Sequence, residues 1–354
     1  RCSPIFENSD LALSLIVILG ASTAFFAATV GLVQNDIKRI IAYSTCSQLG
    51  YMFVALGVGA YQVAIFHLFT HAFFKALLFL GSGSVIHAMS DEQDIRRMGG
   101  LFKIIPFTWI MMLIGTLALT GAPLLSGYYS KDAIIESAFA SQALGHEYAF
   151  YLLVFSALLT SFYSWRLIFL TFHGKTRASQ DIISKAHESP LSMTVPLFLL
   201  SIGAILSGFI FSDFFLSHDF KNIWGNSIYI NPNNHILEEI HHSPFWVKKI
   251  PLVMMGIGFF LSYIFYIILK DIPSYLSNKM SFIYNFLLNK WYFDELYDAL
   301  FVKPSKKFGL FLWKFFDLKI IDGFGPDGIS AIIKRFSIKA NKFQSGFIYQ
   351  YAFV

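Results

Sequence analysis

Three ionisable side chains lie at regular spacing inside one long apolar run of this sequence. In FHLFTHAFFKALLFL, the residues His67, His71 and Lys75 stand four positions apart. On an α-helix this spacing aligns them along one stripe. A charged side chain at the centre of a bilayer costs about 2.5–3.5 kcal/mol even on lenient insertion scales, so it must face protein or water. The stripe is therefore a candidate functional site.

Proton transfer is the chemistry that this stripe fits best. Histidine changes protonation readily near neutral pH because its ordinary pKa is about 6.5. Lysine does so only where burial disfavours its charged form. Two imidazoles with no nearby carboxylate or thiolate make a poor metal site, so we expect no bound metal. A packing role for His67 and His71 is the structural alternative.

A second charged group follows a segment that should interrupt a helix. In LTGAPLLSGYYSKDAIIE, Gly121, Pro123 and Gly127 lie late in an uncharged apolar run. Proline removes a backbone donor and glycine weakens helix propagation, so we expect a broken helix just before Lys131 and Asp132. Such breaks mark ion sites in transporters, because irregular backbone survives in a bilayer only where protein or water satisfies it. A tolerated proline kink is the alternative.

The composition is that of an all-α polytopic membrane protein. Of the 354 residues, 55% are hydrophobic and 14% are charged, and the mean hydropathy is +0.57. A helix needs about 20 apolar residues to cross a hydrocarbon core of about 30 Å. We predict spans at about 11–33, 40–59, 62–88, 104–129, 148–172, 191–212 and 247–269.

The charged loops predict the orientation of the chain. The net charge is +5, and basic residues recur in alternate loops between the predicted spans, at Lys38, Arg39, Arg96, Arg97, Lys103, Lys175, Arg177 and Lys185. These loops fall on one side by parity, which the positive-inside rule assigns to the cytoplasm or the mitochondrial matrix. No basic face coincides with soluble, base-stacking structure, so nucleic acid is not an expected partner.

The sequence predicts no redox cofactor in this chain. Cys2 and Cys46 are too few for a disulfide framework or for an Fe–S or zinc site, and there is no glycine-rich dinucleotide motif. The chain opens at Arg1 with neither a methionine nor a signal peptide. We therefore expect the sequence to be a fragment of a longer protein.

From about residue 291 the apolar residues follow a helical period with charges between them. Phe293, Leu296, Tyr297 and Leu300 begin this pattern, which predicts an amphipathic helix rather than a span. We expect breaks at Pro304 and at the glycine and proline cluster of residues 323–326. Anchoring on a membrane surface and bracing against a partner's helices are both open functions for it.

Several segments together resemble the largest antiporter-like subunit of respiratory complex I, called chain L in bacteria and chain 5 in mitochondria. They are GLVQNDIKRIIAYSTCSQLGYMFVALGVGAY, FHLFTHAFFKALLFLGSGSVIHAMSDEQDIRRMGG, LTGAPLLSGYYSKDAI, and WYFDELYDALFVKPSKK with KIIDGFGPDG. The first three are also similar to segments of other complex I membrane subunits and of multisubunit cation/proton antiporters. The last points to chain L.

The resemblance implies two inverted repeats of five helices, each with a broken helix, followed by extra helices and a lateral helix. On that template, residues 1–172 form the second repeat, and residues 173–270 form two further spans and an outer loop. Residues 271–342 form the lateral amphipathic helix, and residues 343–354 begin a truncated last span. The first repeat is absent from the sequence.

The resemblance also implies roles for the candidate residues. His67, His71 and Lys75 would belong to a central proton path, and Lys131 and Asp132 would lead to its outer exit. Ser44, Thr45 and Gln48 in the preceding span could support water along this path.

The remaining implications concern partners. FMN, the Fe–S clusters and quinone would lie in partner subunits, and the lateral helix would run along neighbouring antiporter-like subunits. The location would be the bacterial inner or the mitochondrial inner membrane. A subunit of a Na⁺/H⁺ antiporter is the alternative function, and a purely structural membrane brace is a third.

Overall fold

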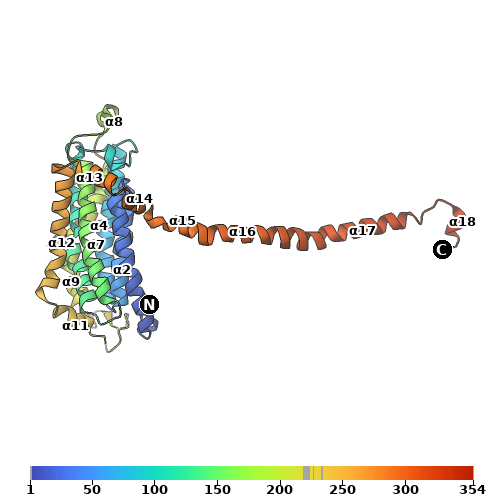
Figure 1. Cartoon of the computed structure of the whole chain (residues 1–354), viewed down its shortest axis with the longest axis horizontal. Coiled ribbons are helices and arrows are strands. Elements are labelled where there is room, and N and C mark those ends of the chain that lie inside the picture. The colour runs from blue at the N-terminus through green and yellow to red at the C-terminus, as the bar shows by residue number, and fades with distance from the viewer. Residues whose placement is uncertain (1, 218–223, 226, 233, 354) are drawn as a thin grey trace. The chain divides into compact units, whose positions relative to one another are not determined.

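Figure 1 shows a computed structural model of the chain, which describes residues 2–217, 224–225, 227–232 and 234–353. Part of the predicted outer loop, at residues 218–223, 226 and 233, lies outside these. The described residues form helices and no strand, apart from one isolated bridge between Asp36 and Asp94. Contacts divide the chain into two units, Arg1–Leu288 and Asn289–Val354.

Within the described residues of the first unit, six helices are long and apolar enough to cross a membrane. They are α2 (Asp10–Val33), α3 (Ile37–Gly57), α4 (Tyr61–Ala88), α7 (His146–Phe172), α9 (Leu191–Leu216) and α12 (Phe245–Tyr263), which η3 (Ile264–Ile268) extends as a wider turn. In place of the seventh predicted span, at about 104–129, the structure has a shorter apolar helix, α5 (Pro106–Thr120), followed by a second half-helix. The expected all-α polytopic fold is confirmed.

The two-part helix breaks where the sequence predicts. Helix α5 (Pro106–Thr120) ends at Gly121, whose φ of +83° is a left-handed conformation that glycine adopts without steric cost. Helix α6 (Ser126–Ala140) begins five residues later. At Gly127 a side-chain carbon would collide with the Ala118 carbonyl oxygen, so only glycine lets the two half-helices approach this closely.

The basic loops meet at one end of the first unit. They contain η1 (Ile95–Arg97), η2 (Leu101–Lys103) and α8 (Gln180–Lys185). The start of α3 contacts the loop that contains η1, because Ile37 N–H donates to the Gln93 carbonyl at 3.0 Å. The loop after α7 contacts the same region, because Arg177 Nε donates to the Arg96 carbonyl at 2.8 Å. The short helices α1 (Ser3–Phe6) and α11 (Ile236–His241) lie at the opposite end (Figure 1). The predicted clustering of positive loops on one side is confirmed.

Two apolar clusters fill the first unit, and a layer of polar side chains separates them. The inner cluster contains Met98 and Leu101 beside the basic loops, and the outer cluster contains Ile236 and Ile240 of α11. Between the two clusters, α3, α4 and α6 contribute the buried residues that we call the polar layer: Ser44, Gln48, His67, Thr70, His71, Lys75, Ser130, Lys131 and Asp132.

The first unit ends with two short helices, α13 (Ile272–Lys279) and α14 (Ser281–Leu288). The second unit is a run of helical segments with exposed side chains: η4 (Lys290–Tyr292), α15 (Phe293–Tyr297), η5 (Asp298–Val302), α16 (Lys303–Phe311), η6 (Leu312–Asp322), α17 (Pro326–Asn341) and α18 (Ile348–Tyr351).

The breaks in the amphipathic segment follow the sequence only in part. The interruption expected in the glycine and proline cluster is confirmed at Gly325, which leaves helical geometry with ψ of −110°. The break expected at Pro304 is wrong, because Val302 and Lys303 keep helical dihedral angles. Proline lacks a backbone donor and its ring crowds the preceding turn, and the widened turn of η5 gives the ring room. Residues 290–292, each with φ of +56°, form a kink that the sequence did not predict.

We predict that Gly127→Ala lowers the thermal midpoint of the assembled protein, by a loss of about 1–3 kcal/mol, because the added methyl group forces α5 and α6 apart. Gly83→Ala on α4 is the matched control, since nothing lies within 4 Å of the added carbon there. Equal midpoints for the two variants would show that the close approach at the helix break does not matter for stability.

Candidate functional site

The three residues of the α4 stripe all lie inside the first unit. The exposed fractions of His67, His71 and Lys75 are 0%, 6% and 4%. Because charged and polar side chains cannot face lipid without a large cost, α4 turns this stripe towards α3, α6 and α7 rather than outwards. The sequence prediction that these residues share one buried face agrees with the geometry.

Lys75 has a polar partner on a neighbouring span. Its Nζ donates to Ser44 Oγ of α3 at 2.7 Å, and the Tyr163 hydroxyl of α7 donates to the same oxygen at 2.7 Å. A cavity of about 10 Å³ lies against Ser44, Lys75 and Thr116, close to the volume that a single water molecule needs. Three helices therefore meet at one hydroxyl group beside the buried amine.

His67 is hydrogen-bonded at both ring nitrogens. Its Nε2 lies 3.1 Å from Gln48 Oε1, and its Nδ1 lies 2.9 Å from Ser130 Oγ. Because the amide oxygen only accepts, Nε2 donates, and the neutral ring accepts at Nδ1 from the Ser130 hydroxyl. Thr70 Oγ1 lies 2.7 Å from the same serine oxygen. The result is a buried chain of polar groups from α3 through α4 to α6.

His71 is placed differently from its neighbour. Its Nε2 is buried and has no hydrogen-bond partner in the described part of the chain. The ring packs edge-on against Phe74, with centroids 5.3 Å apart, and lies 5.8 Å from the His67 ring. The structure thus brings His71 beside the polar chain without bonding it into that chain.

Lys131 is held against the end of the broken helix. It is 1% exposed, and its Nζ donates to the Thr120 carbonyl at 3.0 Å and to the Leu119 carbonyl at 3.4 Å. The last carbonyls of α5 have no partners within their own helix, and they carry the negative end of its dipole. The break therefore creates a binding place for a cationic side chain in the interior of the first unit.

Asp132 faces the outer end of the unit. Both carboxylate oxygens are buried, and neither has a hydrogen-bond partner among the described groups. The residue borders a cavity of about 330 Å³ that also contacts Glu136, His241 and Lys248. Asp132 also approaches the helix break, because a side-chain carbon at Gly121 would lie 3.6 Å from Asp132 Oδ1 and 3.5 Å from Lys131 Nζ.

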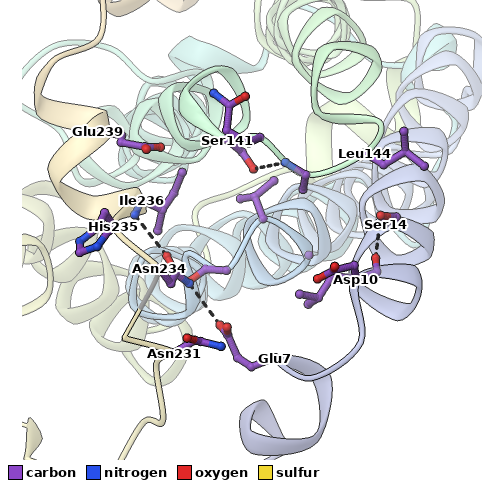
Figure 2. Close-up of a pocket in the computed structure, with 16 residues that line it drawn as sticks. Glu7, Asp10, Ser14, Ser141, Leu144, Asn231, Asn234, His235, Ile236 and Glu239 are labelled. Atoms are coloured by element: carbon purple, nitrogen blue, oxygen red, sulfur yellow. Dashed lines mark hydrogen bonds between the residues drawn. The ribbon is translucent and has the colours of Figure 1, made fainter.

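A larger outer pocket lies apart from the polar layer. Figure 2 shows its walls, which include Glu7, Asp10 and Glu239, and its volume is about 610 Å³. Asn234 closes one side, because its Nδ2 donates to Glu7 Oε1 at 3.1 Å and to the Gly59 carbonyl at 3.2 Å. No residue of the polar layer lines this pocket, so the smaller cavity at Asp132 is the one connected with the candidate site.

The sequence identified only some of the polar partners. Ser44 and Gln48 bond directly to Lys75 and His67, whereas the Thr45 hydroxyl donates to the Ile41 carbonyl of its own helix. Ser130 and Tyr163 were not predicted as partners. Polar side chains inside apolar spans were the available signal, but many such residues serve only their own helix.

Comparisons with known proteins cover most of the chain. A family model described as "NADH:quinone oxidoreductase/Mrp antiporter, TM" matches residues 1–160, and one described as "NADH dehydrogenase subunit 5 C-terminus" matches residues 232–354. The NADH-ubiquinone oxidoreductase chain 5 of Phytophthora infestans is 49% identical over 99% of this chain and 53% of its own length.

Two further relatives agree with these matches. The NADH-quinone oxidoreductase subunit L of Rhodobacter capsulatus is 45% identical over 100% of this chain and 58% of its own length. The NADH-ubiquinone oxidoreductase chain 5 of Arabidopsis thaliana is 44% identical over 100% of this chain and 53% of its own length. The chain therefore spans about half the length of the curated relatives it matches.

We predict that Ser44→Ala destabilises the first unit by about 1–3 kcal/mol, because it leaves the buried Lys75 amine and the Tyr163 hydroxyl without their shared acceptor. Thr45→Ala is the matched control, since that hydroxyl serves only its own helix. Thermal unfolding of the assembled protein measures both. A midpoint for Ser44→Ala no lower than that of Thr45→Ala would contradict the prediction.

Proposed function

The chain belongs to the family of NADH-quinone oxidoreductase subunit L and NADH-ubiquinone oxidoreductase chain 5, and we propose that it translocates protons within that complex. The resemblance seen in the sequence is thus confirmed at the level of the family. The observation that supports the proposal most is His67, a fully buried imidazole hydrogen-bonded at both nitrogens to groups on two other helices.

Such an imidazole suits stepwise proton transfer. A neutral imidazole can take up a proton at its unprotonated nitrogen, so His67 exchanges protons through Nδ1 on the Ser130 side. Gln48 orients the ring by accepting from Nε2. In the proposed path Lys75 holds or releases a proton in response to charge changes nearby, with Ser44 and the adjoining small cavity as its contact to water.

Lys131 and Asp132 form the proposed outer part of the path. Lys131 sits at the carbonyl end of α5, where its charge is stabilised by the helix dipole. Asp132 borders the outer cavity together with Glu136. In the proposed path the Asp132 carboxylate accepts the proton that arrives by way of Ser130 and Lys131 and releases it into this cavity. His71 lies beside this chain, with its ring centroid 5.8 Å from that of His67, but is not hydrogen-bonded into it.

The proposal places the redox chemistry in other subunits. Flavin, Fe–S clusters and quinone would be held by partner chains, whose quinone reduction would change the charge along the polar layer. The neighbouring antiporter-like subunits would be the partners of the amphipathic segment, in the inner membrane of a bacterium or a mitochondrion. Residues 1–172 would correspond to the second antiporter-like repeat of the full-length subunit.

Cation exchange in an Mrp-type antiporter is the competing function, because the match over residues 1–160 covers both classes. The match of residues 232–354 to the subunit 5 C-terminus favours the complex I function. Purification of the native assembly distinguishes them. We expect NADH oxidation coupled to proton uptake into vesicles, and cation exchange without any NADH requirement would reject the proposal.

We predict that Lys75→Met slows proton transfer through this subunit by about 100-fold or more, as expected for loss of a proton-transferring group. Lys75→Arg should be similarly impaired, because guanidinium keeps the positive charge but does not deprotonate. Protons pumped per NADH in reconstituted vesicles measure the effect. An unchanged ratio in both variants, with the complex fully assembled, would remove Lys75 from the mechanism.

A second prediction concerns the serine between the two halves of the path. Ser130→Ala should slow proton transfer about five- to tenfold, the worth of roughly one net hydrogen bond, because His67 Nδ1 loses its partner. Ser137→Ala on the same helix is the control, since its hydroxyl donates to the Ile134 carbonyl of α6 itself. The proposed route predicts that only the first variant is slow, and equal rates would argue against it.

A further inference from the structure

A pocket at the basic end of the first unit is lined by cations. It has a volume of about 740 Å³ and lies where the ends of α2 and α7 meet η3, α13 and α14. Arg96, Arg166, Arg177 and Lys270 line it, and no carboxylate is found among its lining residues. It shares no residue with the polar layer, so the proposed proton path does not account for it.

Most of this positive charge is not neutralised. Arg96 is paired, with its Nη2 2.6 Å from Asp94 Oδ2. Arg166 Nη2 donates to the neutral Asn35 Oδ1 at 2.8 Å, and Arg177 donates to backbone carbonyls. Within the described residues, no ion pair is formed by Arg166, Arg177 or Lys270. The pocket therefore holds three uncompensated cations.

Arg166 is the deepest of these cations and has an unused donor. It is 6% exposed, and its Nε has no hydrogen-bond partner among the described groups. Burying a guanidinium with neither a counter-charge nor a full set of acceptors is costly. Burial lowers the pKa of His173, so this ring adds no charge at neutral pH. An anion in the pocket would offset the cost.

The rest of the wall is apolar and continuous with the outer surface of the bundle. Phe162, Phe265 and Leu287 contribute to it. Only 17% of the residues in the apolar stretch formed by α12 and η3 are buried inside the protein. In the apolar stretch of α7 the share is 78%. An occupant with a charged head and hydrocarbon chains could therefore enter from the membrane.

We propose that this pocket binds an anionic phospholipid of the inner leaflet, with its phosphate against Arg166, Arg177 and Lys270 and its acyl chains along η3. Juxtamembrane cations attract anionic lipids by about 1 kcal/mol per Lys or Arg. The volume of the pocket is within the range of small-molecule sites. A free phosphate would satisfy the cations but would leave the apolar wall without a partner.

The test uses the purified, delipidated complex with phosphatidylglycerol in mixed micelles, and native mass spectrometry to count bound lipid. We expect phosphatidylglycerol to bind in preference to phosphatidylcholine. Lys270→Gln should weaken its binding about fivefold, the effect of one cation. Lys279→Gln, which makes the same charge change on α13 outside the pocket, should leave binding unchanged.

A second variant tests the pocket without changing its charge. Ser277→Trp should fill the cavity and abolish the selective binding, and Ser277 lies on the short exposed helix α13, where a large side chain does not disturb the core. Equal binding of the two lipids, unchanged binding in both pocket variants, or full displacement of phosphatidylglycerol by millimolar inorganic phosphate would each overturn the proposal.

Discussion

The burial of ionisable side chains inside a bilayer-spanning bundle is the constraint on which the rest of this structure depends. Lys75, Lys131 and Asp132 are 4%, 1% and 6% exposed. In a low-dielectric interior each charge needs an acceptor, a donor, a dipole or water close by. The hydroxyl of Ser44 and the carbonyl end of α5 meet this need for the two lysines. Asp132 borders a cavity, and its Oδ1 lies beside Gly121 at the helix break, where the Lys131 amine also lies.

The arrangement of the helices follows from that constraint. Apolar side chains gather into an inner and an outer cluster, and the polar side chains of α3, α4 and α6 collect between them. The interruption between α5 and α6 is part of the same solution, since a continuous helix would use the carbonyls that receive Lys131. The break therefore removes helical hydrogen bonds at this point and supplies acceptors for the buried Lys131 amine.

The basic loops show the same physics at the inner end. Here the exposed cations are solvated at the end of the bundle, whereas the buried Arg166 still needs acceptors or an anion. Asp94 neutralises Arg96 and accepts from its backbone N–H at 2.9 Å, which fixes the loop. Arg166 and Arg177 then hold three loops together through backbone carbonyls and leave their charge directed into one pocket.

The sequence alone determined what depends on local spacing: six long spans, the stripe of His67, His71 and Lys75, the break before Lys131, and the side on which basic loops gather. Hydropathy and the helical period encode these features within a few turns of chain. The wrong prediction of a break at Pro304 also has a local cause. The wider turn of η5 before this proline lets the helix continue.

Only the tertiary structure decided which polar groups meet. His67 and Ser130 are 63 residues apart in the chain, and Tyr163 reaches Ser44 across 119 residues. Serines and tyrosines in other spans have the same local sequence signature, and helix crossing alone selects among them. The cation-lined pocket arises in the same way, from residues of four separate segments that no periodicity relates.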